Sequence, residues 1–226
     1  MNPMVPALAV ITLALSACSG PVHAAEEPVN APVAERVAKE RGLQTAIFAG
    51  GCFWGVEGVF SHVKGVTAAV AGYHGGSAAT AKYNRITAGG TDHAESVQIT
   101  YDPAIIRYDQ LLRIFFSVVA DPTLKNRQGP DIGRHYRSAL VPTTPEQRVV
   151  AKAYLAQLEA AKLWPRSIVT RIEPLRKFYP AEGYHQDFMA KNPRHGYIQR
   201  WDKPKVEALK ALFPAQYRAA FLRDAA

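Results

Sequence analysis

The sequence predicts one α+β domain over residues 43–226, in which strands and helices alternate to form a two-layer α/β sandwich. The chain has 226 residues, is 48% hydrophobic, and has 16 Gly and 16 Pro residues that are scattered rather than clustered. This composition is typical of a single globular domain with a real core. Short β-prone runs bounded by Gly or Pro alternate with segments in which apolar residues recur at helical spacing.

The first predicted elements are a strand, a helix and two more strands. Residues 45–49 form a β-prone run that ends at Gly50-Gly51, and apolar residues recur at helical spacing over 53–63. Residues 66–73 are the second predicted strand, and a polar loop follows it. Over residues 95–101 the side chains alternate between an apolar and a polar face, so a third strand is expected there.

The second half is predicted to contain two helices and two strands. Apolar spacing indicates a helix over 111–119, and a strand is expected near 138–141. Thr144 is the expected N-cap of a long helix, with Pro145 at its first position. A last strand at 167–172 precedes an extension, rich in aromatics, Pro and His, that is expected to be irregular. The first six elements match the ferredoxin-like arrangement of two split βαβ units.

The N-terminal residues have the composition of an export signal. Residues 5–17 are an uncharged apolar run, shorter than the roughly 20 residues of a membrane-spanning helix, which indicates a secretory signal within residues 1–24. Two cleavage sites fit: a lipobox that leaves a lipid-modified Cys18 as first residue, and signal cleavage after Ala24. We expect an exported, periplasmic bacterial protein, which is a membrane-anchored lipoprotein if the lipobox is used. Residues 25–42 are expected to be a flexible tether.

The charge of the chain does not indicate a nucleic-acid partner. The formal net charge is +8, but the basic residues are spread along the sequence without a dense Lys/Arg block or an aromatic RNA-binding signature. We interpret the charge as favouring solubility and weak surface attraction.

Cys52 is the strongest candidate for a reactive residue. It is the one free thiol left if Cys18 is lipidated or removed, and in an oxidising compartment an unpaired cysteine is a liability unless its reactivity is used. It also stands at the start of the first predicted helix, where the helix dipole and unpaired N–H groups favour a thiolate with a lowered pKa. Phe53 and Trp54 would give the thiol an aromatic floor suited to a thioether methyl group. Simple core packing of all three residues is the alternative interpretation.

Glu95 is the candidate acid. It lies on the apolar face of its predicted strand, where lost hydration raises the pKa of a carboxyl group and keeps it protonated near neutral pH. A neutral carboxylic acid of this kind can donate a proton to a reacting group. The alternative is a strand-end carboxylate that reaches solvent.

The pentapeptide Gly51-Cys52-Phe53-Trp54-Gly55 follows the first predicted strand. It is similar to the signature of the A-type peptide methionine sulfoxide reductases, and the sequence resembles this family from about Thr45 to Tyr197. Further segments agree in order: Gly72-Tyr73-His74-Gly75-Gly76, His93-Ala94-Glu95, Asn126-Arg127-Gln128-Gly129, Tyr136-Arg137-Ser138, Phe178-Tyr179-Pro180-Ala181-Glu182 and Tyr184-His185-Gln186.

The resemblance implies a role for each matching residue. Cys52 matches the nucleophile, which becomes a sulfenic acid, and Glu95 matches the acid that protonates the oxygen of a methionine S-sulfoxide. Phe53 and Trp54 match the pocket that receives the substrate methyl group. The remaining matches are polar residues of the same site: Tyr83, Tyr136 and Asp131.

This chain departs from the family in its C-terminal part. Many members carry resolving cysteines there, but Gly196-Tyr197-Ile198 has Ile, and no Cys follows. We therefore expect an external reductant, either a small-molecule thiol or a thioredoxin- or glutaredoxin-like protein, and no bound cofactor. Ala120 and Arg134-His135 also differ from the usual residues of the substrate loops. The expected partners are oxidised proteins, peptides or free methionine sulfoxide, and the protein is expected to be a monomer.

Three other functions compete with this interpretation. A metal site built from Cys52 with His74, His93 and His135 lacks zinc-ligand spacing, so no metal is expected. A thiol peroxidase or a Cys/His hydrolase would leave Phe53-Trp54 without a purpose. A lipid-anchored module that binds oxidised proteins without turnover is the third alternative, and a single-turnover assay separates it from an enzyme.

Overall fold

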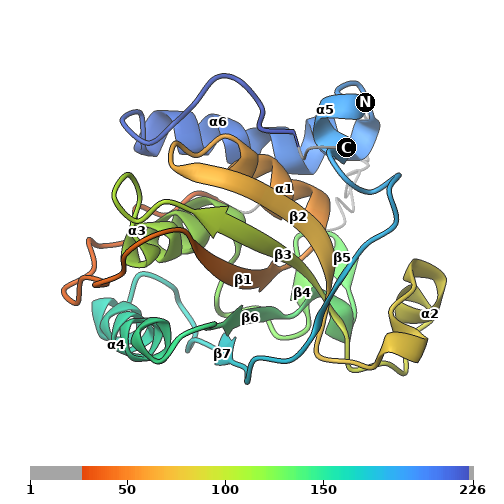
Figure 1. Ribbon diagram of the computed structural model, residues 1–226, viewed down its shortest axis with the longest axis horizontal. Coiled ribbons are helices and arrows are strands. Elements are labelled where there is room, and N and C mark those ends of the chain that lie inside the picture. The colour runs from red at the N-terminus through yellow and green to blue at the C-terminus, as the bar shows by residue number, and fades with distance from the viewer. Residues whose placement is uncertain (1–26, 224–226) are drawn as a thin grey trace, which may run out of the picture.

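The fold is a central six-stranded sheet with helices packed on it (Figure 1). The structure is a computed structural model, and it describes residues 27–223. The strand order is β7-β6-β1-β3-β2-β8, and all neighbouring pairs are antiparallel except the parallel pair β6-β7. The strands are β1 (Gln44–Gly50), β2 (Val66–His74), β3 (Ala94–Tyr101), β6 (Ser138–Val141), β7 (Arg171–Ile172) and β8 (Phe178–Pro180).

Helices α1 and α3 cover one face of this sheet. The ring of Phe48 in β1 contacts Phe60 of α1, and it also contacts Tyr108 and Phe115 of α3 and the π-helical turn that continues it. These rings are all buried and form the centre of the core. The principal helices are α1 (Phe53–Ser61), α3 (Tyr108–Ile114), α4 (Pro145–Ala161) and α6 (Lys203–Leu212).

Shorter elements surround one end of the sheet. Strands β4 and β5 form a separate two-stranded ribbon, and α2 stands away from the sheet (Figure 1). The short elements are η1 (Ala78–Thr80), α2 (Tyr83–Thr87), η2 (Phe115–Val119), β4 (Arg127–Gln128), β5 (Asp131–Ile132), η3 (Arg134–Tyr136), α5 (Phe188–Lys191) and η4 (Ile198–Asp202).

The structure confirms the α+β class and several local predictions. Because α1 joins β1 to β2 and β3 lies between these two strands, the sheet contains a split βαβ unit. Glu95 is buried together with the apolar residues of its face of β3. Thr144 caps α4, since its side chain accepts a hydrogen bond from the Gln147 backbone N–H at 3.1 Å.

The predicted irregular C-terminal extension is wrong in its most important part. Residues 203–212 form α6, which begins with Pro204 in its first turn and buries Leu209 against the core. The helical period here is short and weakly apolar, and the Pro- and aromatic-rich residues before it obscured it. The predicted strand at 167–172 is also shorter, because only β7 at its end pairs with β6.

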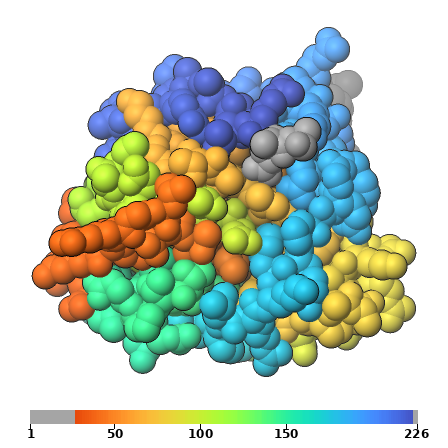
Figure 2. Space-filling view, in the orientation of Figure 1, coloured from red at the N-terminus to blue at the C-terminus, as the bar shows by residue number. Residues whose placement is uncertain are grey.

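The described part of the predicted tether packs on the domain. Residues 28–41 contain no helix or strand, but Ala31, Ala34 and Ala38 are buried in the core cluster. Figure 2 shows this segment lying across the surface against α4. The small side chains of these alanines allow this close approach, which composition alone did not indicate.

The predicted export signal at 1–24, including Cys18, lies outside the described residues. Within residues 27–223, no helix is long and apolar enough to cross a membrane.

Candidate active site

Cys52 lies where β1 passes into α1. Gly51 makes the turn with a φ of 89°, and a Cβ there would press against the Gln128 side chain, so only glycine fits. Cys52 itself is the N-cap residue of α1 and is half-buried. The sequence prediction of a cysteine at a helix N-terminus is therefore confirmed.

Glu95 reaches the same helix end from β3. Its side chain is 1% exposed, and its Oε2 accepts a hydrogen bond from the Phe53 backbone N–H at 3.1 Å. Burial raises the pKa of Glu95 to about 8, the Phe53 hydrogen bond lowers it, and the nearby charges of Asp131 and Asp202 raise it. Glu95 is therefore largely protonated at pH 7 and has a proton to donate.

The expected lowering of the Cys52 pKa is wrong. Desolvation raises the pKa of the thiol well above its ordinary value, and the carboxylates of Glu95, Asp202 and Asp131 raise it further. The hydrogen bond with the Trp54 backbone lowers it, but this effect of the helix N-terminus is outweighed. Cys52 is therefore a thiol at rest, and a substrate that takes up a proton would favour its ionisation.

Trp54 forms an aromatic wall that the C-terminal residues complete. Its ring stacks on Phe188 with centroids 3.6 Å apart and planes 5° apart, and Tyr197 meets it edge-on at 5.9 Å. Its Nε1–H donates to His185 Nδ1 at 3.1 Å. The indole is thus fixed on several sides, with its orientation set by residues more than 130 positions along the chain.

Phe53 supports this wall from inside. Its ring is 1% exposed and lies 4.9 Å from the ring of the buried His185 and 5.8 Å from that of Tyr73. Of the two residues predicted to hold a methyl group, Trp54 keeps more exposed surface than Phe53.

Tyr83 and Tyr136 come from two different short helices but lie within electrostatic reach of Glu95 and Cys52. Burial raises the pKa of Tyr83 to about 12, and the charges of Glu95 and Cys52 contribute. Burial also raises the pKa of Tyr136, and the charges of Glu95, Asp131 and Cys52 raise it further. Both phenols are protonated at neutral pH and remain hydrogen-bond donors.

Asp131 comes from β5 and accepts a hydrogen bond from the Tyr197 hydroxyl. Burial raises the pKa of Asp131, and the bond from Tyr197 and the charge of Lys205 lower it. The structure therefore brings together all seven predicted site residues: Cys52, Phe53, Trp54, Tyr83, Glu95, Asp131 and Tyr136.

Sequence reasoning missed several residues of the site. Tyr197 was noted only as a neighbour of the position where a resolving cysteine was sought, and His185 only as part of a family segment. Asp202 is buried and lies so close to Gly55 of α1 that a Cβ there would collide with its carboxylate. The signal available was the occurrence of Tyr197, Trp201 and Asp202 within six residues.

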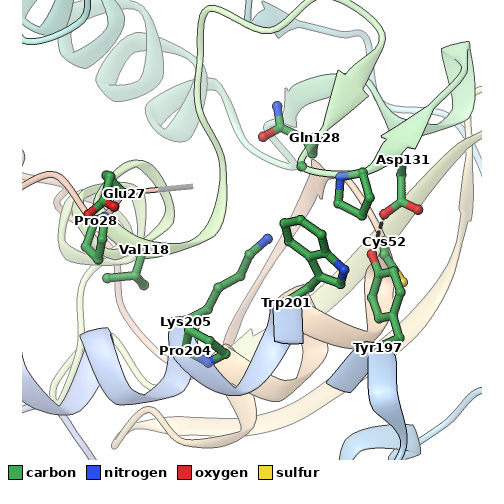
Figure 3. Close-up of a pocket in the computed structure, with 12 residues that line it drawn as sticks. Glu27, Pro28, Cys52, Val118, Gln128, Asp131, Tyr197, Trp201, Pro204 and Lys205 are labelled. Atoms are coloured by element: carbon green, nitrogen blue, oxygen red, sulfur yellow. Dashed lines mark hydrogen bonds between the residues drawn. The ribbon is translucent and has the colours of Figure 1, made fainter. Parts of the chain in front are cut away.

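A cavity of about 230 Å³ opens beside Cys52 (Figure 3). Tyr197 and Asp131 lie at the Cys52 end, and Trp201 and Lys205 of the C-terminal helical segment form a side of it. A small substrate group can therefore reach the thiol from solvent.

The histidines considered as metal ligands have other partners. His74 Nε2 accepts from the Arg176 backbone N–H at 3.0 Å, and His93 bonds with the backbone of Gly76 and Ser77. Within residues 27–223, no three His, Cys, Asp or Glu side chains are grouped so that they could hold a metal ion.

Comparison with known proteins shows the family of this chain. Residues 44–217 match a family model described as "Peptide methionine sulfoxide reductase". A relative from Mesorhizobium japonicum, "Peptide methionine sulfoxide reductase MsrA 2", is 56% identical over 176 residues, which cover 78% of this chain and 90% of the relative. A protein of the same name from Synechocystis is 51% identical over 179 residues, covering 79% and 84%.

Two solved structures have a similar fold. The reduced form of Mxr1 from Saccharomyces cerevisiae superposes with a TM-score of 0.59 at 32% identity, covering 71% of this chain and 92% of that chain. Methionine sulfoxide reductase A of Corynebacterium diphtheriae gives 0.57 at 32% identity, covering 77% and 86%.

Proposed function

Since this chain belongs to the peptide methionine sulfoxide reductase family and is an oxidoreductase of the A type, we propose that Cys52 is its nucleophile and Glu95 its proton donor. The substrate is methionine sulfoxide, and enzymes of this family need no bound cofactor. The proposed reaction converts the sulfoxide to methionine and leaves the oxygen on Cys52.

The observation that supports this proposal is the position of Glu95. Its carboxyl group is buried, is held by the Phe53 N–H next to Cys52, and has a pKa of about 8. A buried carboxylic acid that stays protonated near neutral pH is an unusual feature outside catalytic sites. A donor is therefore available beside the thiol before the substrate arrives.

The proposed step balances without a further reactant. Cys52 Sγ bonds to the substrate sulfur while Glu95 gives its proton to the sulfoxide oxygen. The sulfur–oxygen bond of the substrate and the new bond between its sulfur and Cys52 Sγ then break, the thioether leaves, and the hydroxyl group is transferred to Cys52 as a sulfenic acid. The thiol proton returns to Glu95, so the sulfoxide gains the two electrons that Cys52 loses.

Tyr83 and Tyr136 are proposed to donate hydrogen bonds to the sulfoxide oxygen. Both are protonated phenols near Glu95 and Cys52, and negative charge builds up on that oxygen as the sulfur is attacked. Asp131, fixed by Tyr197, is proposed to orient the polar part of the substrate. Trp54 and Phe53 are proposed to receive the methyl group, and this pocket would select the S epimer.

Regeneration is proposed to use an external thiol. The sequence has two cysteines, and Cys18 would be lipidated or removed, so no second thiol would remain to resolve the sulfenic acid on Cys52. A first thiol would displace water to give a mixed disulfide, and a second would release Cys52. The reductant is proposed to be a small thiol or a thioredoxin- or glutaredoxin-like protein.

The protein is proposed to act as a monomer outside the cytoplasm, on oxidised proteins, peptides or free methionine sulfoxide, in the repair of oxidative damage. The composition of residues 1–24 supports export to a bacterial periplasm, and the Cys18 lipobox supports a lipid anchor over cleavage after Ala24. Mass spectrometry of the mature N-terminus distinguishes the two.

A single-turnover experiment tests the proposed chemistry. Reduced enzyme mixed with excess methionine S-sulfoxide, without a reductant, is expected to release one methionine per chain and to gain one oxygen on Cys52. The Cys52→Ser variant is the control and is expected to release none. Methionine release by that variant contradicts the assignment of the nucleophile, and tight binding without release by the wild type indicates a binding module.

A further inference from the structure

The cavity beside Cys52 continues past the site described above. A second cavity, of about 240 Å³, is lined by residues of the 116–121 turn and by Leu163-Trp164-Pro165. The two cavities share Glu27, Pro28 and Val118, so they adjoin at these residues. Together they reach the size range of pockets that enclose a ligand much larger than one side-chain methyl group.

We propose that these cavities form a subsite for the polypeptide that flanks the oxidised methionine, and that residues 27–38, here called the strap, form its outer wall. This inference rests on the proposed function, because it concerns what the same enzyme binds next to the reacting sulfur. The strap precedes the residues matched by the family model, which begin at 44. The subsite is therefore partly built by a segment outside the residues that the family model matches.

The strap is held rigidly enough to serve as a wall. The Val29 N–H donates to the Ser117 carbonyl at 2.9 Å, and the Ala31 N–H donates to Ser117 Oγ at 3.1 Å. The Ala31 carbonyl accepts from Arg113 Nε at 2.8 Å. Further along, the Ala38 N–H donates to the buried Asp109 carboxylate at 3.0 Å. These bonds fix the backbone directly after Pro28, which faces the cavity.

The opposite wall is formed by Trp201 and Lys205. The Trp201 ring packs beside the Gly129 backbone and has the Arg200 guanidinium over it at 5.1 Å, so it is held in place. Lys205 Nζ donates to the Val119 carbonyl at 2.9 Å, which links α6 to the 116–121 turn. The strap is hydrogen-bonded to the same turn at Ser117. Figure 3 shows Trp201 and Lys205 between Cys52 on one side and Pro28 on the other.

The chemistry of these walls indicates the occupant. Pro28, Val118, Pro130, Trp201 and Pro204 present apolar surface, with charged groups at the rim and at the Cys52 end. A methionine sulfoxide side chain engaged at Cys52 carries its own backbone out along this surface if it belongs to a peptide. We therefore assign the subsite to a flanking residue with an apolar side chain, as found around a methionine exposed from a protein core.

Steady-state kinetics with a small-thiol reductant test this subsite. The probes are free methionine S-sulfoxide and a blocked pentapeptide with the S-sulfoxide between leucines. Trp201→Ala and Pro28→Asp are expected to lower the ratio of the peptide kcat/KM to the free-sulfoxide kcat/KM by about tenfold, mainly through the peptide KM. Val33→Ser, at a strap residue 64% exposed and away from both cavities, is the matched control and is expected to keep the ratio.

The outcomes separate this inference from the proposed function. An unchanged ratio in both variants, with circular dichroism and thermal unfolding like those of wild type, overturns the subsite. A shift in the KM of a thioredoxin-like reductant without a change in the ratio assigns the cavity to the reductant and also overturns it. Failure of the wild type to reduce free methionine S-sulfoxide and the peptide would instead count against the proposed function.

Discussion

Glu95 Oε2 lies 3.1 Å from the backbone nitrogen of Phe53, the first residue of α1 and the chain neighbour of Cys52. One hydrogen bond thus fixes the acid of β3 against the helix end that carries the thiol. The acid is therefore positioned beside the thiol before a substrate enters.

Replacing the acid is expected to slow chemistry and spare binding. Glu95→Gln keeps a side-chain oxygen for the Phe53 N–H but has no acidic proton, so sulfenic acid formation is expected to slow by about a hundredfold or more. Rapid-quench measurement of methionine release checks this. Asp92→Asn, a 71% exposed carboxylate, is the control for the lost charge, and an unchanged single-turnover rate in Glu95→Gln would exclude the proton-donor role.

The rate is expected to depend on the protonation of Glu95. Because the reactive form is the protonated acid and its pKa is about 8, the single-turnover rate is expected to fall as the pH rises through about 8. A pH series of the same assay measures this limb. The limb should be missing from the residual activity of Glu95→Gln, and its persistence there would assign it to another group.

The stability of the folded protein is expected to decrease as the pH rises, because of the same carboxyl group. Its pKa is raised in the folded state from 4.5 to about 8, so its contribution is fully present below pH 4.5 and is lost as the pH rises through about 8. Within this window Glu95 is expected to remove up to about 1.4 kcal/mol of unfolding free energy per pH unit. Urea unfolding of wild type and Glu95→Gln checks this: the variant should be the more stable protein at pH 8, and equal stabilities there contradict the burial of a charge.

The two phenols are expected to act on the same oxygen. Tyr83→Phe and Tyr136→Phe each remove one donor, and each is expected to lower the single-turnover rate by about ten- to hundredfold. Tyr184→Phe, whose side chain is 60% exposed, is the control and should leave the rate near wild type. If the double variant is no slower than either single variant, only one of the hydroxyl groups reaches the oxygen at a time.

A methyl group at Gly55 is expected to disturb the site through the packing of Asp202 on α1. The new Cβ of Gly55→Ala would collide with the Asp202 carboxylate, so the Asp202 side chain must shift, in the same segment that carries Tyr197. Activity is expected to fall at least tenfold, and the melting temperature is expected to fall as well. Gly183→Ala, which meets nothing within 4 Å, is the matched control and should change neither quantity. Full activity in Gly55→Ala would show that the packing of Asp202 on α1 is dispensable.

The local parts of the site could be predicted from the sequence. Gly50-Gly51 before an apolar helical repeat indicated a thiol at a helix start, and the alternation of residues 95–101 placed Glu95 on the buried face. Each depends on contacts between residues near one another in the chain, for which short patterns exist. The cap at Thr144 was predictable for the same reason.

The ionisation of Cys52 shows the limit of such reasoning. The helix N-terminus was visible in the sequence and favours a thiolate, but the outcome depends on how deeply three other segments bury the sulfur and how close their carboxylates lie. The same holds for the strap, whose alanines gave no periodic signal although Ala31 is completely buried.

By itself the sequence determined the family, the α+β class, the reactive thiol and the acid that faces the core, because signature residues and short periodic patterns record them. Only the tertiary structure decided the protonation state of the thiol, the wall that Phe188 and Tyr197 build around Trp54, and the cavity closed by the strap and α6. These features join residues such as Asp131 and Tyr197, 66 positions apart. Contacts over such distances are selected by the packing of the whole core, and no local pattern carries them.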